Sequence, residues 1–202
     1  MNDDQTFRAV LIGVVLLVLP IGIYYRLQSQ ATREKLDRWQ EGLFILVTLR
    51  PLGLALWLGL IAWMIDPDWM AWSSVPLPVW LRWTGVGVLV LACGLFVWTF
   101  RSLGKNLTDT VVTRQTHTLV LNGPYRWVRH PFYDSAALVV LANSLIVANW
   151  FLFVFGAVVF SLLVIRTRTE EENLVARFGD NYREYMKRTG RFLPRMTANR
   201  RG

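Results

Sequence analysis

Residues 122–134 read NGPYRWVRHPFYD, a basic and aromatic stretch that separates two long apolar parts of the chain. The Asn-Gly-Pro triplet at 122–124 predicts a turn, because glycine accepts unusual dihedral angles and proline fixes its own φ. Pro131 suits the first position of a helix, where its missing N–H costs no hydrogen bond. We therefore expect a helix to begin there, with His130 directly before its first residue. So many donors at the edge of a membrane-spanning helix form an expected site for an anionic or polar ligand.

The composition indicates an integral membrane protein. Of the 202 residues, 53% are hydrophobic and 18% are charged, which is more apolar than a typical soluble domain. The net charge of +8 comes mainly from segments between apolar blocks, where basic residues suit anionic lipid headgroups rather than nucleic acid. Cys93 is the only cysteine, so we expect neither a disulfide framework nor a metal site. The oligomeric state is open.

Five apolar blocks predict an all-α, polytopic membrane protein with a single domain over residues 1–202. They cover about residues 7–25, 42–65, 79–100, 133–148 and 151–165. The first three are long enough to cross a hydrocarbon core of about 30 Å at about 1.5 Å per residue. The last two are shorter, and one continuous helix would be too long, so we expect a helical hairpin with a tight turn at Asn149.

The polar segments predict the remaining organisation. Residues 101–132 form a connection too long to be passive in so small a protein. After the last span, Leu174, Phe178 and Tyr182 recur at helical spacing, which predicts an amphipathic helix over residues 168–189. Lys and Arg gather in segments 26–41 and 101–132 and in the tail, but not in 66–78. This bias predicts an outside N-terminus and a cytosolic C-terminus.

Three charged or small features inside the apolar blocks have structural interpretations. Arg50 is either a functional intramembrane cation or a side chain that reaches back to the headgroups. Arg82, between two tryptophans, looks like an interfacial anchor. Gly85, Gly87 and Gly94 permit close approach of a second helix.

Arg168 and Glu172 share one helix face just beyond the last span, because they are four residues apart. They could be a simple structural ion pair. Alternatively, they present a cation and a carboxylate to the same cavity as residues 125–133. A carboxylate would suit a ligand ammonium, and an arginine would suit a substrate carboxylate. The spacing alone leaves both interpretations open.

Several motifs, in order, resemble the isoprenylcysteine carboxyl methyltransferase family of membrane enzymes. They are HTLV at 117–120, GPY at 123–125, RHPFY at 129–133, RTEEE at 168–172, FG at 178–179 and the tyrosines at 182 and 185. The resemblance covers about residues 104–194 and implies an S-adenosylmethionine-dependent methyltransferase with a helical membrane fold. Asp134 departs from the family pattern, in which a small apolar residue is expected.

The resemblance also implies roles for individual residues, with 101–132 as the cofactor-binding loop. The cofactor would contact His117, Thr118, Leu119, Val120, Tyr125, Arg129, His130, Pro131, Phe132, Tyr133 and Glu172. Arg168 would orient the methyl acceptor, and no residue is assigned a covalent catalytic role. The active site would face the cytosol of a bacterial inner membrane, or of the endoplasmic reticulum in a eukaryote.

The expected acceptor is lipophilic, first of all the α-carboxylate of a prenylated cysteine. That group is already ionised and needs no general base, whereas a lipid amine or small thiol would need one, for which His130 and Glu170 are candidates. A second alternative is an NADPH-dependent enzyme similar to membrane sterol reductases, although those chains are much longer. A haem or quinone protein using His117 and His130, and a non-catalytic binding protein, are the remaining alternatives.

Overall fold

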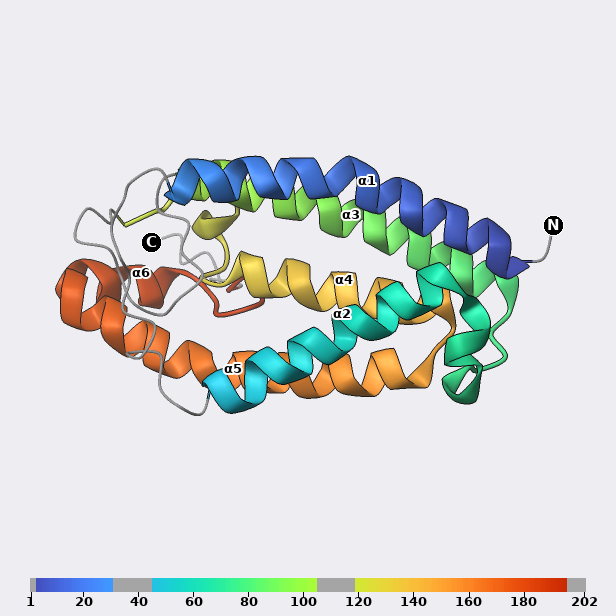
Figure 1. The fold of residues 1–202 in the computed structure, drawn as a ribbon. Helices are drawn as coiled ribbons and strands as arrows, with labels where there is room; N and C mark the ends of the chain where they lie inside the picture. Colours follow the sequence, from blue (N-terminus) through green and yellow to red (C-terminus); the bar gives the residue numbers. More distant parts are fainter. Residues whose placement is uncertain (1–2, 31–44, 105–118, 196–202) are drawn as a thin grey trace.

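The computed structural model describes residues 3–30, 45–104 and 119–195, and within these ranges the regular elements are helices (Figure 1). Five helices run back and forth along the bundle, and α6 follows at one end: α1 (Asp3–Gln30), α2 (Arg50–Ile65), α3 (Val79–Leu103), α4 (Pro131–Val147), α5 (Trp150–Phe178) and α6 (Asp180–Arg188). Three short elements join them: η2 (Ile45–Leu49), η3 (Pro67–Ser73) and η5 (Gly123–Arg126). His117, Thr118 and residues 31–44 and 105–118 lie outside the described residues.

The helices confirm the all-α fold and the membrane assignment. Four segments are long and apolar enough to cross a bilayer: Asp3–Tyr25, Val47–Ile65, Val79–Leu103 and Trp150–Phe178. The fourth block of the sequence forms α4, a shorter apolar helix of 17 residues, or about 25 Å. Arg50 is exposed at the first position of α2, near the beginning of its span, where a long side chain can reach the headgroups.

The expected turn at Asn149 joins α4 to α5. Ala148 adopts a left-handed conformation with φ of 52°, and the Asn149 side chain accepts a hydrogen bond of 3.1 Å from the backbone N–H of Leu152. The Asn149 amide also donates to Ser73 Oγ at 2.7 Å. One side chain therefore caps α5 and ties the hairpin to η3. We call this the Asn149 end of the bundle and the opposite end the α6 end.

The C-terminal boundary differs from the sequence prediction. No new helix begins near residue 168, because α5 continues unbroken from Trp150 to Phe178. Neither proline nor glycine interrupts the chain between the apolar block and the charged turn that follows it, so the helix propagates. The break comes at Gly179, whose φ of 57° is accessible to glycine at little cost. The amphipathic segment thus belongs partly to α5 and partly to α6.

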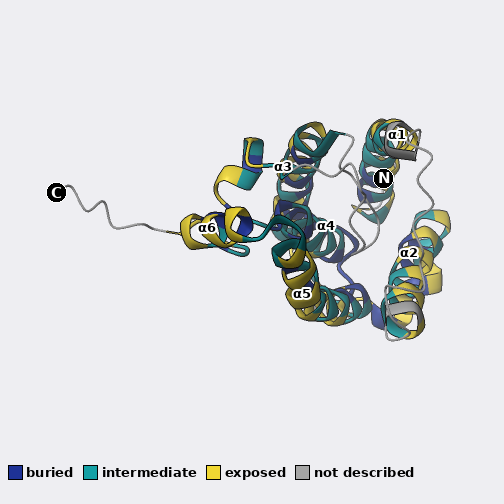
Figure 2. Ribbon diagram, turned by 90° about the vertical axis from the view of Figure 1, so that its left-hand side faces the viewer, coloured by how far each residue is buried: buried dark blue, intermediate teal, exposed yellow. Residues whose placement is uncertain are grey.

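α4 packs closely against both α3 and α5. A Cβ atom on Gly85 would lie 2.9 Å from the Leu145 Cβ atom, so this glycine sets the approach of α3 to α4 as expected. Within the described ranges, Gly87 and Gly94 have no such neighbour within 4 Å and so do not set this approach. Figure 2 shows how buried residues collect between the helices, whereas the outward faces carry intermediate and exposed residues.

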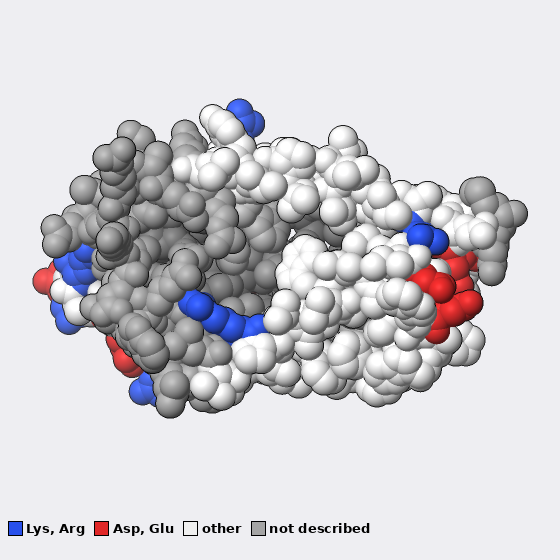
Figure 3. All heavy atoms as spheres, viewed as in Figure 1, with Lys and Arg blue, Asp and Glu red and all other residues white. Residues whose placement is uncertain are grey.

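The outward faces are apolar, as lipid contact requires. Large side chains such as Leu16, Leu17 and Leu91 are exposed on α1 and α3. On the face in Figure 3, acidic side chains and an adjacent basic one gather at the Asn149 end, and a broad uncharged surface separates them from the charged side chains toward the other end. An uncharged apolar band of this kind is typical of bundles that span the bilayer.

Arg82 is not the interfacial anchor expected from the sequence. It is only 6% exposed, and its guanidinium forms a 2.8 Å ion pair with Asp4. Its Nε donates to the backbone oxygen of Ile146 at 2.9 Å, and it lies 4.1 Å from the ring centroid of Phe7. A carboxylate at the beginning of α1 and a free carbonyl at the end of α4 together allow the charge to be buried.

Candidate active site

The turn before α4 is held against the chain that follows α6. The backbone N–H of Arg129 donates to the oxygen of Gly190 at 2.9 Å, and that of His130 donates to Arg191 at 3.1 Å. Gly190 in turn donates to the oxygen of Trp127 at 3.2 Å. Segments about sixty residues apart therefore pair like two short strands, which positions the side chains of Arg129 and His130 toward α5.

Glu171 on α5 is the centre of the resulting group of charges. Its carboxylate is 3.2 Å from His130 Nε2 and 2.7 Å from Arg129 Nε. Arg191 contributes a second guanidinium at 2.5 Å. The side chain of Glu171 is only 4% exposed, so the paired cations compensate a charge that has left water. We call Glu171, Arg129, His130 and Arg191 the Glu171 cluster.

Arg129 also holds the end of α6. Its Nη1 atom donates to the backbone oxygens of Met186 at 3.2 Å and Thr189 at 2.5 Å. These are carbonyl groups of the last helical turn, which lack partners within the helix. The guanidinium thus joins α5, α6 and the turn before α4 through one planar set of donors.

A second carboxylate lies beside this cluster. The Tyr133 hydroxyl donates to Glu170 Oε2 at 2.8 Å, and the Tyr133 ring stacks on His130 with centroids 5.5 Å apart. Glu170 is half-buried. The Nε atom of Arg166, one helical turn earlier, is buried with no hydrogen-bond partner among the described residues. Unlike Glu171, both groups keep hydrogen-bonding capacity for another molecule.

The tyrosines of α6 support the turn from the other side. The hydroxyl of Tyr185 donates to the backbone oxygen of Tyr125 at 2.6 Å, and the Tyr182 ring is buried next to it. Burial raises the pKa of both phenols, so they remain neutral donors. Phe132 points the other way, toward Phe96 and Phe100 of α3.

The structure brings the two predicted segments together, but through different residues of α5. Glu170 and Glu171 reach residues 129–133, whereas Arg168 and Glu172 form a 3.2 Å pair on the surface, with side chains 83% and 65% exposed. Leu119 and Val120 are half-buried just before the turn. Pro131 occupies the first position of α4, and Asp134 lies half-buried in its first turn.

Sequence reasoning missed Glu171 and Arg191 as site residues. A signal for Glu171 was present, because it is three residues before Leu174 and seven before Phe178, on the predicted buried face of the helix. Thr167, one turn earlier, is fully buried on the same face. Arg191 lies in an irregular segment without periodicity, so no pattern in the sequence could place it.

Comparisons with known proteins agree with the resemblance stated from the motifs. The model of the isoprenylcysteine carboxyl methyltransferase family matches residues 85–176. The protein-S-isoprenylcysteine O-methyltransferase of Mus musculus is 32% identical over 130 residues, covering 61% of this chain and 44% of that protein. The chain therefore spans less than half the length of this relative.

Two further comparisons cover more of the chain. Methanethiol S-methyltransferase of Mycobacterium tuberculosis is 24% identical over 217 residues, covering 93% of this chain and 79% of that protein. The solved structure of the eukaryotic intramembrane Ras methyltransferase of the family matches with a TM-score of 0.55 and 23% identity, covering 72% of this chain and 51% of that one. The fold is thus shared with that structure, and residues 85–176 carry the sequence pattern of the isoprenylcysteine carboxyl methyltransferase family.

Proposed function

We propose that this protein is an S-adenosylmethionine-dependent methyltransferase that acts on a lipophilic acceptor at the membrane. The observation that carries the proposal is the meeting of residues 129–133 with Glu170 and Glu171 of α5. These segments bear the motifs of the resemblance and are distant in sequence. Their contact creates one place where cations, carboxylates and aromatic rings lie side by side.

The residues present suit the chemical groups of the cofactor. Adenosylmethionine carries a sulfonium, an ammonium and a carboxylate, and when bound it supplies an activated methyl group. Aromatic rings such as those of Tyr125 and Tyr133 attract a sulfonium, whereas the Phe132 ring lies against Phe96 and Phe100 of α3. Glu170 has acceptor capacity for the ammonium, and the unpaired Arg166 Nε atom can donate to the carboxylate.

The Glu171 cluster would then act as a frame rather than as a ligand contact. Donors from Arg129, His130 and Arg191 already occupy the Glu171 carboxylate. Arg129 also donates to two backbone oxygens. The cluster fixes His130 and, through the stacked rings, Tyr133. Leu119, Val120 and Pro131 keep their proposed places at the cofactor, together with His117 and Thr118 outside the described residues.

Geometry favours Glu170 over Glu172 as the carboxylate at the cofactor. Glu170 is half-buried and hydrogen-bonded to Tyr133, whereas Glu172 is exposed beside Arg168. We propose that Arg168, with Glu172 as its partner, receives the acceptor. An exposed guanidinium of this kind can orient a carboxylate arriving from the headgroup region.

The first candidate acceptor is the carboxylate of a prenylated cysteine. It is ionised before the reaction, so the residues need only align it and exclude water. A small thiol is the second candidate. It is favoured by the relative named as a methanethiol S-methyltransferase, which matches 93% of this chain. A thiol must lose its proton, and we propose Glu170 as the base that accepts it.

The proposed orientation puts the α6 end in the cytosol. Exposed Arg183, Lys187 and Arg188 lie on α6, whereas the connection at the Asn149 end has no Lys or Arg between residues 66 and 78. Basic residues are retained on the cytosolic side of membrane proteins. In a bacterium the membrane would be the inner membrane.

A transfer assay with methyl-labelled adenosylmethionine tests the function. The purified full chain in lipid vesicles is offered a prenylated cysteine, a small thiol or a lipid amine. We expect label in one acceptor class, and at least about a hundredfold loss in Glu170→Gln if that group holds the cofactor or acts as a base. Absence of transfer to every class, by protein that retains its fold, would contradict the proposal.

A further inference from the structure

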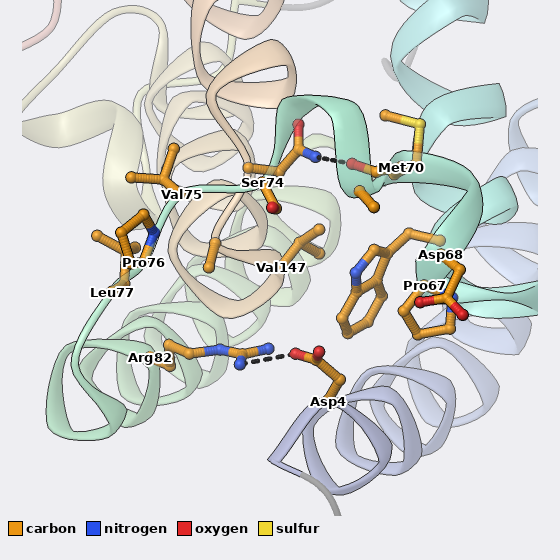
Figure 4. Close-up of a pocket in the computed structure, with 14 residues that line it drawn as sticks. Asp4, Pro67, Asp68, Met70, Ser74, Val75, Pro76, Leu77, Arg82 and Val147 are labelled. Atoms are coloured by element: carbon orange, nitrogen blue, oxygen red, sulfur yellow. Dashed lines mark hydrogen bonds and ion pairs between the residues drawn. The ribbon is translucent and has the colours of Figure 1, made fainter.

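A pocket of about 320 Å³ lies at the Asn149 end of the bundle. Figure 1 shows that the α4–α5 turn at this end lies opposite α6. The beginning of α1, η3, the segment leading into α3 and the α4–α5 turn surround it (Figure 4). Pockets for small molecules have volumes of about 300–1,000 Å³. This pocket therefore has room for a group the size of a lipid headgroup. We call it the outer pocket.

A buried arginine lines the outer pocket with unused hydrogen-bonding capacity. The Nε and Nη1 atoms of Arg82 are engaged by Ile146 and Asp4. Its Nη2 atom is buried and has no partner among the described residues. Figure 4 shows the guanidinium pointing across the pocket toward Asp4. A buried donor without a partner destabilises the protein, and an acceptor oxygen on a bound molecule would remove that cost.

Two carboxylates line the same pocket. Asp4 is 43% exposed despite its pair with Arg82, and Asp68 is exposed on η3. With one guanidinium and two carboxylates, the lining repels a simple anion. It also leaves carboxylate oxygens free to accept hydrogen bonds from a cation. The complementary ligand carries an anionic oxygen and an ammonium group close together.

Exposed tryptophans place the outer pocket at the depth of the lipid headgroups. Five of them surround this end of the bundle: Trp69, Trp72, Trp80, Trp83 and Trp150. Indole rings gather at the boundary between hydrocarbon and headgroups. The adjacent surface is the apolar band of the helices, along which acyl chains would lie. A membrane lipid can therefore present its headgroup to the pocket without leaving the bilayer.

We propose that the outer pocket binds the headgroup of a zwitterionic phospholipid that carries a primary ammonium. The phosphate oxygen accepts a hydrogen bond from Arg82 Nη2, and the ammonium donates hydrogen bonds to the carboxylates of Asp4 and Asp68. A choline lipid fits less well, because its quaternary ammonium has no N–H to donate. A glycerol lipid fits less well, because its phosphate has no cationic group beside it and faces the two carboxylates as a net anion. The selectivity is independent of the methyl-transfer reaction, because the two sites lie at opposite ends of the bundle.

Lipid binding to the delipidated full chain in detergent tests the proposal. Native mass spectrometry measures the affinity for phosphatidylethanolamine, phosphatidylcholine and phosphatidylglycerol with identical acyl chains. We expect ethanolamine lipid to bind at least about tenfold tighter than glycerol lipid, equivalent to about 1.4 kcal/mol. Asp68→Asn should remove most of this preference. The Asp4→Asn and Asp68→Asn double variant should prefer phosphatidylglycerol, because the lining then carries a net positive charge.

The matched control is Glu184→Gln, which removes an exposed carboxylate from α6 at the other end. It should leave the lipid preference unchanged. Equal preference in wild type and Asp68→Asn would overturn the proposal, as would tightest binding of phosphatidylglycerol by wild type. Soluble glycerophosphoethanolamine separates a lipid from a free zwitterion. If it binds as tightly as the lipid, the assignment to a membrane lipid is wrong.

Discussion

Replacing Glu171 by glutamine should destabilise the protein strongly. The substitution keeps the size of the side chain but removes a charge that compensates Arg129, whose side chain is only 9% exposed. Breaking a buried ion pair from one side costs about 3–5 kcal/mol. Arg191 is 40% exposed and regains water, and glutamine retains one acceptor oxygen, so we place the loss at about 3 kcal/mol. For a chain of this size that lowers Tm by about 6–12 °C.

Thermal unfolding followed by tryptophan fluorescence in detergent micelles measures this shift. Glu172→Gln is the matched control, because it removes a neighbouring carboxylate that is exposed and forms a surface pair with Arg168. Exposed pairs contribute about 0–1 kcal/mol, so its Tm should change by no more than about 4 °C. If the two variants unfold at the same temperature, the Glu171 cluster does not hold α5, α6 and the turn before α4 together.

Three further predictions concern other parts of the molecule. Gly85→Ala should lower the free energy of unfolding by about 1–2 kcal/mol, because the added methyl group overpacks the contact with α4. Gly87→Ala should be neutral or stabilising, because the space beside Gly87 is open among the described residues. Chemical denaturation measures both free energies. Asn149→Ala should cost about 1–2 kcal/mol through loss of the α5 cap, measured in the same way. Arg168→Ala and Glu172→Ala should each raise KM for the acceptor without weakening adenosylmethionine binding. If Glu172→Ala instead binds adenosylmethionine more weakly, Glu172 contacts the cofactor, as the family resemblance implies.

Much of the fold could be predicted because the membrane imposes simple rules. Apolar blocks of the right length become helices, since no other arrangement satisfies the backbone in hydrocarbon. The turn at Asn149 followed from length alone, because the apolar blocks on either side of it could not form one helix across the bilayer. The start of α4 at Pro131 followed from the missing N–H of proline.

Other features depended on tertiary partners that no local pattern reveals. Arg82 is buried because Asp4, far away in sequence, meets it across α1 and α3. The Arg168 and Glu172 spacing indicated a shared face correctly, but it could not say that this face is exposed. Glu171 was within reach of the sequence, because the periodicity of Leu174 and Phe178 extends back to it. The run of three glutamates obscured which one is buried.

The central claim is that residues 125–133 and the α5 turn containing Glu170 hold a charged methyl donor. Isothermal titration of the purified protein with adenosylmethionine, and separately with NADPH, tests it most directly. The account predicts saturable binding of adenosylmethionine that Glu170→Gln weakens at least about tenfold, and no binding of NADPH. Binding of NADPH alone, or adenosylmethionine affinity that is identical in wild type and Glu170→Gln, would contradict it.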